Sequence, residues 1–224
     1  MIKNVAIDGP SGAGKSTLSR MLAKKFGLLY VDTGAMYRTI ALHVLQSGVD
    51  SHDREKIKNL LPDIKIRMAY DNEGMQRMYL NGNDVSTDIR LPQVSIYASD
   101  VSAIPEVRSF LLDMQREIAG QSSVIMDGRD IGTVVLPEAG LKIFLVASPE
   151  DRAKRRYEEL YQKGVQTTFE EVLQDINYRD YNDSHRSAAP LKPASGAVLV
   201  DTSGNTLEES FLILSELISR YMKG

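Results

Sequence analysis

The chain has 224 residues, of which 42% are hydrophobic and 25% are charged, as is ordinary for a soluble globular protein. Its net charge of −3 argues against binding nucleic acid through a global basic field. The absence of cysteine excludes disulfides, thiolate metal sites and cysteine nucleophiles. The N-terminus lacks a signal-peptide pattern, and no apolar run approaches the roughly 20 residues that cross a bilayer. We therefore expect a cytoplasmic, monomeric enzyme or switch protein without nucleic-acid or membrane partners.

Short apolar runs that predict strands recur along the chain. Each run is continuous rather than alternating, as expected for strands that are covered on both faces. The runs span residues 4–8, 28–32, 123–127, 142–147 and 197–201. Helical patterns lie between them, for example at 15–26 and 34–48, and two capping-box patterns, Thr168 with Glu171 and Thr206 with Glu209, predict further helix starts. This alternation predicts an α/β fold with a doubly wound, five-stranded parallel sheet.

A stretch of about 90 residues separates the second and third runs, which is far longer than a simple crossover. Residues 64–70 and 75–82 predict a β-hairpin, and Pro92 and Pro105 are typical of the first turn of helices. The stretch is not enriched in Pro, Gly or Ser, so we interpret it as an inserted substrate-side subdomain rather than a linker. We expect a single domain over 1–224, with this insertion at 33–122.

Four of the five runs end in aspartate, at Asp8, Asp32, Asp127 and Asp201. Aspartate also suits an ordinary strand-to-loop transition. Ligands bind beyond the carboxyl ends of strands in open parallel sheets, however, and four aspartates together favour a polar rim that faces a ligand.

The segment GPSGAGKS at 9–16 matches G-x-x-x-x-G-K-[ST], between a predicted strand and a predicted helix. Its glycines permit a loop whose N–H groups converge on phosphate oxygens. Lys15 would bring a positive charge to the β- and γ-phosphates, and the Ser16 hydroxyl is a candidate Mg²⁺ ligand. The pattern predicts a phosphate-binding loop that binds a nucleotide.

A phosphate loop does not by itself give a function. A guanine-nucleotide switch should carry N-K-x-D, which is absent, and a mechanical ATPase should carry an acidic pair where this chain has Asp127 followed by Gly and Arg. A kinase of a small anion needs cations around the phosphates. Arginines follow three of the predicted strands or lie shortly beyond them, at 38, 129, 152, 155, 156, 179 and 186.

On a helix, Arg179, Asp183 and Arg186 share one face at spacings i, i+4 and i+7. They form either a solvated salt-bridge ladder or a site for a polar, anionic ligand. The run 152–156 has a similar alternative, a solvated helix face salt-paired with Glu158 and Glu159.

Six stretches resemble one family along the whole chain: IDGPSGAGKST, VDTGAMYR, LNGNDVSTDIR, DGRDIGTVVLPEA, KIFLVAS and RDYNDSHRSAAPL. The sequence resembles bacterial cytidylate kinase, the CMP/dCMP kinase of the nucleoside monophosphate kinase group. The phosphate loop is shared with many families, whereas DGRDIGTVV together with the 179–191 segment is much more specific. The resemblance implies a three-layer P-loop fold with a monophosphate-binding insertion and a helical lid at 149–186.

The resemblance also implies a role for each candidate residue. ATP would bind Gly9, Pro10, Ser11, Gly12, Ala13, Gly14, Lys15, Ser16 and Thr17, and the loop after Asp201 would lie near the adenine. The acceptor phosphate would bind Thr33, Arg38 and Arg129; the cytosine edge would bind Ser99, Arg108 and Asp130; and the sugar hydroxyls would bind Arg179 and Asp183, with Arg186 near the base. Catalytic charge would come from Lys15, Arg129, Arg152, Arg155 and Arg156, and Ser16 and Asp127 are the candidate Mg²⁺ ligands.

Base chemistry supports a cytosine site, because a carboxylate accepts from the cytosine amino group and a guanidinium donates to N3 and O2. Uracil would place a carbonyl against Asp130. From the residues alone, Ser99 and Arg108 could equally be exposed on helices. The expected reaction is ATP + (d)CMP ⇌ ADP + (d)CDP with Mg²⁺; the alternatives are a kinase of another small acceptor, such as UMP, and a non-catalytic nucleotide sensor.

Overall fold

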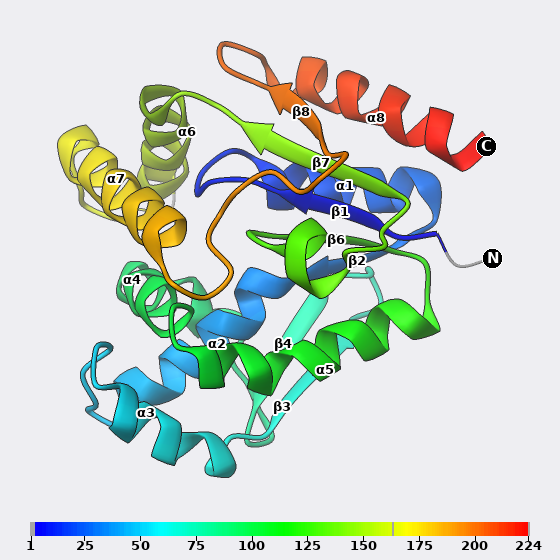
Figure 1. The fold of residues 1–224 in the computed structure, drawn as a ribbon. Helices are drawn as coiled ribbons and strands as arrows, with labels where there is room; N and C mark the ends of the chain where they lie inside the picture. The colour runs from blue at the N-terminus through cyan, green and yellow to red at the C-terminus, as the bar shows by residue number, and fades with distance from the viewer. Residues whose placement is uncertain (1–2, 163, 224) are drawn as a thin grey trace. The chain divides into compact units, whose positions relative to one another are not determined.

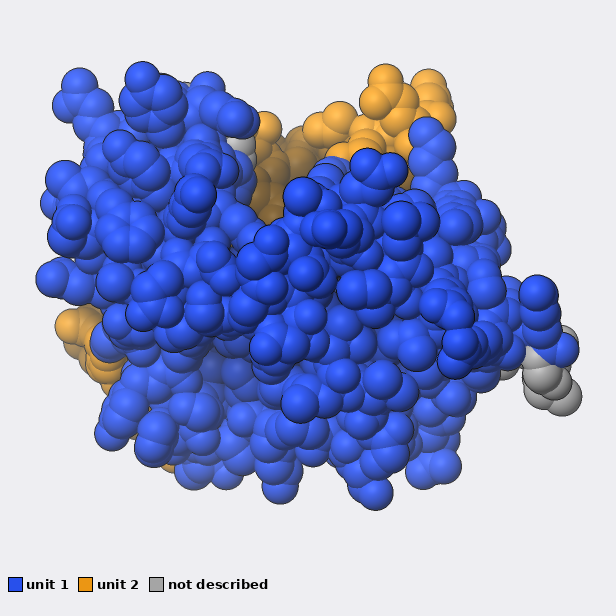
Figure 2. All heavy atoms as spheres, turned by 90° about the horizontal axis from the view of Figure 1, so that it is seen from above, with its two compact units in different colours: residues 1–30, 119–224 blue, residues 31–118 orange. Residues whose placement is uncertain are grey.

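The structure is a computed structural model that describes residues 3–162 and 164–223. The chain divides into two compact units, residues 1–30 with 119–224 and residues 31–118, which Figure 2 shows in different colours.

A five-stranded sheet contains the strands predicted from the five apolar runs, and each of them begins and ends within one residue of its predicted bounds (Figure 1). Its strands are β1 (Val5–Asp8), β2 (Leu29–Asp32), β6 (Val124–Gly128), β7 (Leu141–Val146) and β8 (Val198–Asp201). They lie in the order β2-β6-β1-β7-β8. The pairs β1–β6, β1–β7 and β7–β8 are parallel. The predicted α/β fold with a parallel sheet is therefore confirmed.

The helices α1 (Lys15–Phe26) and α8 (Leu207–Lys223) pack against this sheet in a single apolar core. Leu18 and Leu22 of α1 are buried in it, whereas Met21 is only half-buried. The helix α1 ends at Gly27, whose positive φ of 65° suits a left-handed C-terminal cap. The core holds β1 and α1 rigidly on either side of the loop at 9–14.

The expectation that every strand is covered on both faces is wrong for β8. Leu199 is 63% exposed, and only Val200 of this strand is buried. The reason is position, because β8 lies at the edge of the sheet and its outer flank has no neighbouring strand.

The helices α6 (Pro149–Gln162) and α7 (Phe169–His185) pack on each other through Ala153, Leu160, Val172 and Ile176. The predicted capping box at the start of α7 is confirmed, because Thr168 and Glu171 exchange side-chain and backbone hydrogen bonds of 3.2 and 2.9 Å. Thr206 and Glu209 form the same arrangement before α8.

The second unit contains the predicted hairpin, β3 (Ile66–Tyr70) with β4 (Gln76–Leu80), and a short third strand, β5 (Asn83–Asp84). Its helices are α2 (Thr33–Gln46), α3 (Arg54–Leu60), α4 (Pro92–Val101) and α5 (Pro105–Gln121). Both prolines stand at the first positions of helices, as predicted. Among the described residues, no helix combines the length and apolar character needed to span a membrane.

Candidate active site

The candidate site of the first unit lies beyond the carboxyl ends of the central strands. The strand β1 lies between β6 and β7, so the loops that follow these three strands emerge at one edge of the sheet. Open parallel sheets bind ligands at such an edge. The loop after β1 is the predicted phosphate loop, and it leads directly into α1.

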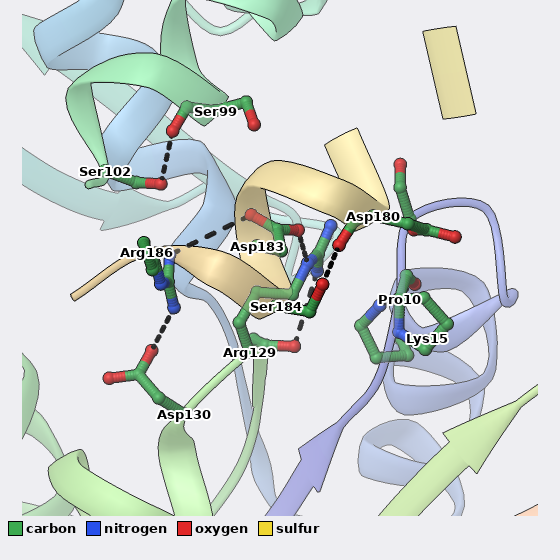
Figure 3. Close-up of polar contacts among 12 residues, drawn as sticks. Pro10, Lys15, Ser99, Ser102, Arg129, Asp130, Asp180, Asp183, Ser184 and Arg186 are labelled. Carbon is green, nitrogen blue, oxygen red and sulfur yellow. Dashed lines mark hydrogen bonds and ion pairs between the residues drawn. The ribbon is translucent and has the colours of Figure 1, made fainter. Parts of the chain in front are cut away.

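The phosphate loop requires its first glycine. A Cβ at Gly9 would lie 2.0 Å from the carbonyl oxygen of Leu145, so no side chain fits there. Lys15 is buried, and its ammonium donates to the carbonyl of Pro10 at 2.6 Å (Figure 3). Burial lowers the pKa of Lys15, and the charge of Arg129 lowers it further. An anion near this ammonium would relieve both effects, since negative charge favours the protonated form.

Ser16 is the first helical residue after Lys15, and its hydroxyl donates to a carboxylate oxygen of Asp127 at 2.9 Å. The other Asp127 oxygen accepts from the hydroxyl of Tyr30 at 3.1 Å. A hydroxyl and a carboxylate are hard oxygen donors, so their chemistry fits Mg²⁺, which commonly keeps water and phosphate oxygens as its other ligands. The described residues contain no group of three or more His, Cys, Asp or Glu side chains that could hold a metal ion.

A buried cluster of arginines and carboxylates follows β6 and ends α7 (Figure 3). Arg129 donates through Nε to Asp183 at 2.6 Å. Arg186 lies 3.9 Å from the other oxygen of Asp183 and 3.6 Å from Asp130. Asp183 is 5% exposed and Arg186 is 8% exposed, so the alternative of a solvated ladder is wrong.

Guanidinium groups surround the carboxylate of Asp183 in this cluster. Burial alone would raise the pKa of Asp183, but the charges of Arg129, Arg186 and Arg179 outweigh it and hold the pKa below its usual value. Asp183 is therefore an anion that keeps guanidinium groups in place at the end of α7. Such a cluster suits a ligand that carries both phosphate and hydroxyl groups.

The three arginines of α6 have different surroundings. Arg152 is buried and donates to the carbonyls of Ala147 and Ser11, at 2.8 and 2.9 Å, and it pairs with Asp180 at 2.6 Å. Arg155 donates to the carbonyl of Thr202 at 2.6 Å, in the loop after β8.

Arg156 pairs with Glu159 at 2.7 Å. Arg156 thus has one of the salt-pair partners of the alternative interpretation, whereas Arg152 and Arg155 hold the loops around the phosphate site.

In the second unit, Asp32 anchors the start of α2. Its carboxylate accepts from the N–H of Ala35 at 2.9 Å and lies 4.0 Å from Arg38 and 3.0 Å from Arg90. Burial would raise the pKa of Asp32, but Arg90 and Arg38 lower it below its usual value. Thr33 is buried at the first position of the same helix, so the predicted phosphate ligands Thr33 and Arg38 belong to one helical segment.

Ser99 and Arg108 are each hydrogen-bonded to Ser102. The Ser102 hydroxyl donates to the Ser99 carbonyl at 2.8 Å (Figure 3), and Arg108 donates to the Ser102 carbonyl at 3.1 Å. The Ser99 hydroxyl is buried and has no hydrogen-bond partner among the described residues. The alternative of an exposed Ser99 is wrong, and its buried hydroxyl is able to donate to, or accept from, a bound ligand or water.

Sequence reasoning missed four residues that hold the predicted ones in place: Asp180, Arg90, Tyr30 and Asp8. For Asp180 the only signal is its place beside Arg179 in the quoted motif. Tyr30 carries no signal in the sequence, because its partner Asp127 depends on the strand order. For Arg90 and Asp8 the only signals are their places in the quoted stretches LNGNDVSTDIR and IDGPSGAGKST and, for Asp8, its place at the end of a strand.

Comparison with known proteins identifies the family. The family model described as "Cytidylate kinase" matches residues 5–220. The chain belongs to the cytidylate kinase family. Proteins named cytidylate kinase include one from Caldicellulosiruptor bescii, 50% identical over 222 residues that cover 98% of this chain and 97% of that one. Another, from Leuconostoc mesenteroides subsp. mesenteroides, is 50% identical over 214 residues, covering 96% and 95%.

Membership of the cytidylate kinase family makes the chain a nucleoside monophosphate kinase with a nucleotide-binding phosphate loop. The phosphate loop, Arg129–Asp130 and the 179–186 segment all fall inside the matched residues. A solved structure of an uncharacterized protein from Eubacterium ventriosum ATCC 27560 is also similar, with a TM-score of 0.52 at 11% identity, covering 97% of this chain and 98% of that one. At that identity the likeness shows the fold alone.

Proposed function

We propose that the protein transfers the γ-phosphoryl group of ATP to CMP and dCMP, giving ADP and CDP or dCDP. The observation that carries the proposal is the pairing, within one unit, of the Lys15 phosphate loop with the buried Arg129–Asp183–Arg186 cluster. The phosphate loop is suited to a triphosphate, and the cluster is suited to another anion that carries hydroxyl groups. Membership of the cytidylate kinase family supports CMP as that second ligand.

The acceptor nucleotide is bound by three groups of side chains. Its phosphate is bound by Thr33, Arg38 and Arg129, and its sugar hydroxyls by Arg179 and Asp183. The cytosine edge is bound by Ser99, Arg108 and Asp130, with Arg186 beside the base. The orphaned Ser99 hydroxyl supports this assignment, because a base atom would give it the partner that it lacks in the protein.

Asp130 discriminates cytosine from uracil through its charge. Its carboxylate accepts from the cytosine amino group, whereas uracil would present a carbonyl oxygen to it. Burial makes the mismatch costly, because two acceptor oxygens would face one another with no proton between them.

The donor ATP is bound by residues 9–17, with its phosphates against the loop N–H groups and Lys15. Ser16 and Asp127 would hold Mg²⁺, which would neutralise charge on the donor phosphates. The acceptor phosphate is already anionic, so no side chain is needed to remove a proton from it. Lys15, Arg129 and the arginines at 152, 155 and 156 supply positive charge and alignment for in-line transfer.

The domain assignments follow from these roles. The insertion at 33–122 is the monophosphate-binding part, and residues 149–186 form the lid and the helix after it, within one kinase domain of 1–224. We further propose that the enzyme acts in the cytoplasm as a monomer on small nucleotides.

A substrate panel tests the proposal. ADP formation is measured with ATP and CMP, dCMP, UMP or AMP in parallel, by a coupled assay. CMP and dCMP should be the best acceptors. Equal or faster turnover of AMP would reject the cytosine assignment, and ATP binding without ADP formation above background would instead indicate a nucleotide sensor.

A further inference from the structure

Asp8 is a buried acid that the proposed mechanism does not use. It ends the central strand β1, directly before Gly9 of the phosphate loop, and it is 3% exposed. Each of its carboxylate oxygens accepts one backbone N–H at 2.7 Å, Oδ1 from Ile131 and Oδ2 from Gly132. Asp8 therefore joins the end of β1 to the segment that follows Asp130, more than 120 residues along the chain.

The segment that Asp8 holds is a single wide helical turn, Ile131–Val135. The N–H groups at the start of a helical turn have no partner within it. At this turn, two of those groups donate to Asp8 instead of to a neighbouring side chain. The carbonyl of Asp130 closes the turn by accepting from Val134 and Val135, at 2.9 and 3.2 Å.

Gly132 allows the close approach of this turn to Asp8. A Cβ at this position would lie 3.3 Å from the Asp8 carboxylate and 3.2 Å from the Cβ of Ala194. Both distances are tighter than ordinary contacts, so a side chain would push the turn away from the carboxylate.

The residues immediately before this turn are Arg129 and Asp130. Arg129 pairs with Asp183 at 2.6 Å, and Asp130 lies 3.6 Å from Arg186. Their backbone leads directly into the two N–H groups that Asp8 fixes. A shift of the turn would therefore move both side chains relative to α7, and a displacement of about 1 Å in a site can cost about 100-fold in rate.

We infer that Asp8 is a positioning residue for acceptor selection, because it fixes the Ile131–Val135 turn and thereby the places of Arg129 and Asp130. The inference rests on the proposed function, since it needs Asp130 to face the base. The end of β1 would then both begin the phosphate loop and fix the turn that follows Asp130.

The test compares Asp8→Asn with Gly132→Ala, which disturb the same contact from its two sides. Asparagine keeps the shape but can accept only one of the two N–H groups. Both variants should raise KM for CMP, in Asp8→Asn by about 10-fold or more because a buried N–H loses its acceptor. In both, the ratio of kcat/KM for CMP to kcat/KM for UMP should fall. Binding of ATP alone, measured by equilibrium titration, should stay within about twofold of wild type, because Lys15 and the loop glycines are unchanged.

Asp71→Asn is the matched control. Asp71 also accepts two backbone N–H groups, from Glu73 and Met75 at 3.0 and 2.8 Å, in the β3–β4 turn, and it is not one of the proposed ligand residues. It should leave KM and the CMP/UMP ratio unchanged. Amide hydrogen exchange gives a second readout, in which Asp8→Asn should speed exchange at Ile131 and Gly132.

The outcomes separate the inference from the proposed function. A wild-type protein that makes no CDP would reject the proposed function and the inference that rests on it. An active wild type with Asp8→Asn unchanged in KM and CMP/UMP ratio would overturn the inference alone. Equal losses of ATP and CMP binding would also overturn it, because Asp8 would then act through the phosphate loop.

Discussion

Substituting Asp183 by asparagine tests the buried ion-pair cluster most sharply. The change keeps the side chain's shape but removes the negative charge that Arg129 and Arg186 share, at 2.6 and 3.9 Å. Removing one partner of a buried ion pair costs about 3–5 kcal/mol, because the other charge is left uncompensated. For a chain of this length, that corresponds to a fall in Tm of roughly 6 °C or more.

The assay is thermal unfolding at pH 7, followed by circular dichroism, for wild type and Asp183→Asn. Glu216→Gln is the control, because Glu216 and Arg220 form an exposed i, i+4 pair on α8 that should contribute little. A Tm for Asp183→Asn within about 1 °C of wild type would show that the cluster is not held by this charge and would refute the reasoning.

Three further predictions follow from other contacts. Asp130→Asn should reduce kcat/KM for CMP more than for UMP, since an amide can donate to the uracil carbonyl; an unchanged ratio would remove Asp130 from base recognition. Burial raises the pKa of Asp8 from 3.8 to about 6, so the folded state binds this proton more tightly than the unfolded state. The stability of wild type relative to Asp8→Asn should therefore fall by about 2 kcal/mol as pH rises from about 4 to 7, measured by urea unfolding, and a flat difference would contradict the buried contact. Asp180→Ala should raise the Kd for ATP, measured by titration, because Arg152 loses the partner that orients it toward the Ser11 carbonyl; an unchanged Kd would show that Arg152 needs no such partner.

The strands and helix starts could be predicted because their signals are local. Continuous apolar runs, the glycine at 27, the prolines at 92 and 105 and the capping box at Thr168 each act on residues close by in sequence. The edge position of β8 could not be predicted, because exposure depends on the strand order and not on the run itself.

The sequence predicts which residues belong to the candidate site, but not which of them contact one another. The four strand-ending aspartates have four different surroundings: Asp8 holds a distant turn, Asp32 pairs with two arginines, Asp127 accepts from Ser16, and Asp201 accepts from nearby Ser203. For Asp8 and Asp127 the partner depends on the order of the strands, which the sequence does not show. For the same reason, a run of arginines on α6 gave no sign that the first of them is buried.

The central claim is that the γ-phosphoryl group moves from ATP to a cytidine monophosphate. It is tested most directly by incubating the protein with ATP labelled in its γ-phosphate, together with CMP and Mg²⁺, and separating the products. The label should appear in the β-phosphate of CDP, with one ADP formed for each CDP. Label recovered only as inorganic phosphate, or only in ATP, would contradict the account.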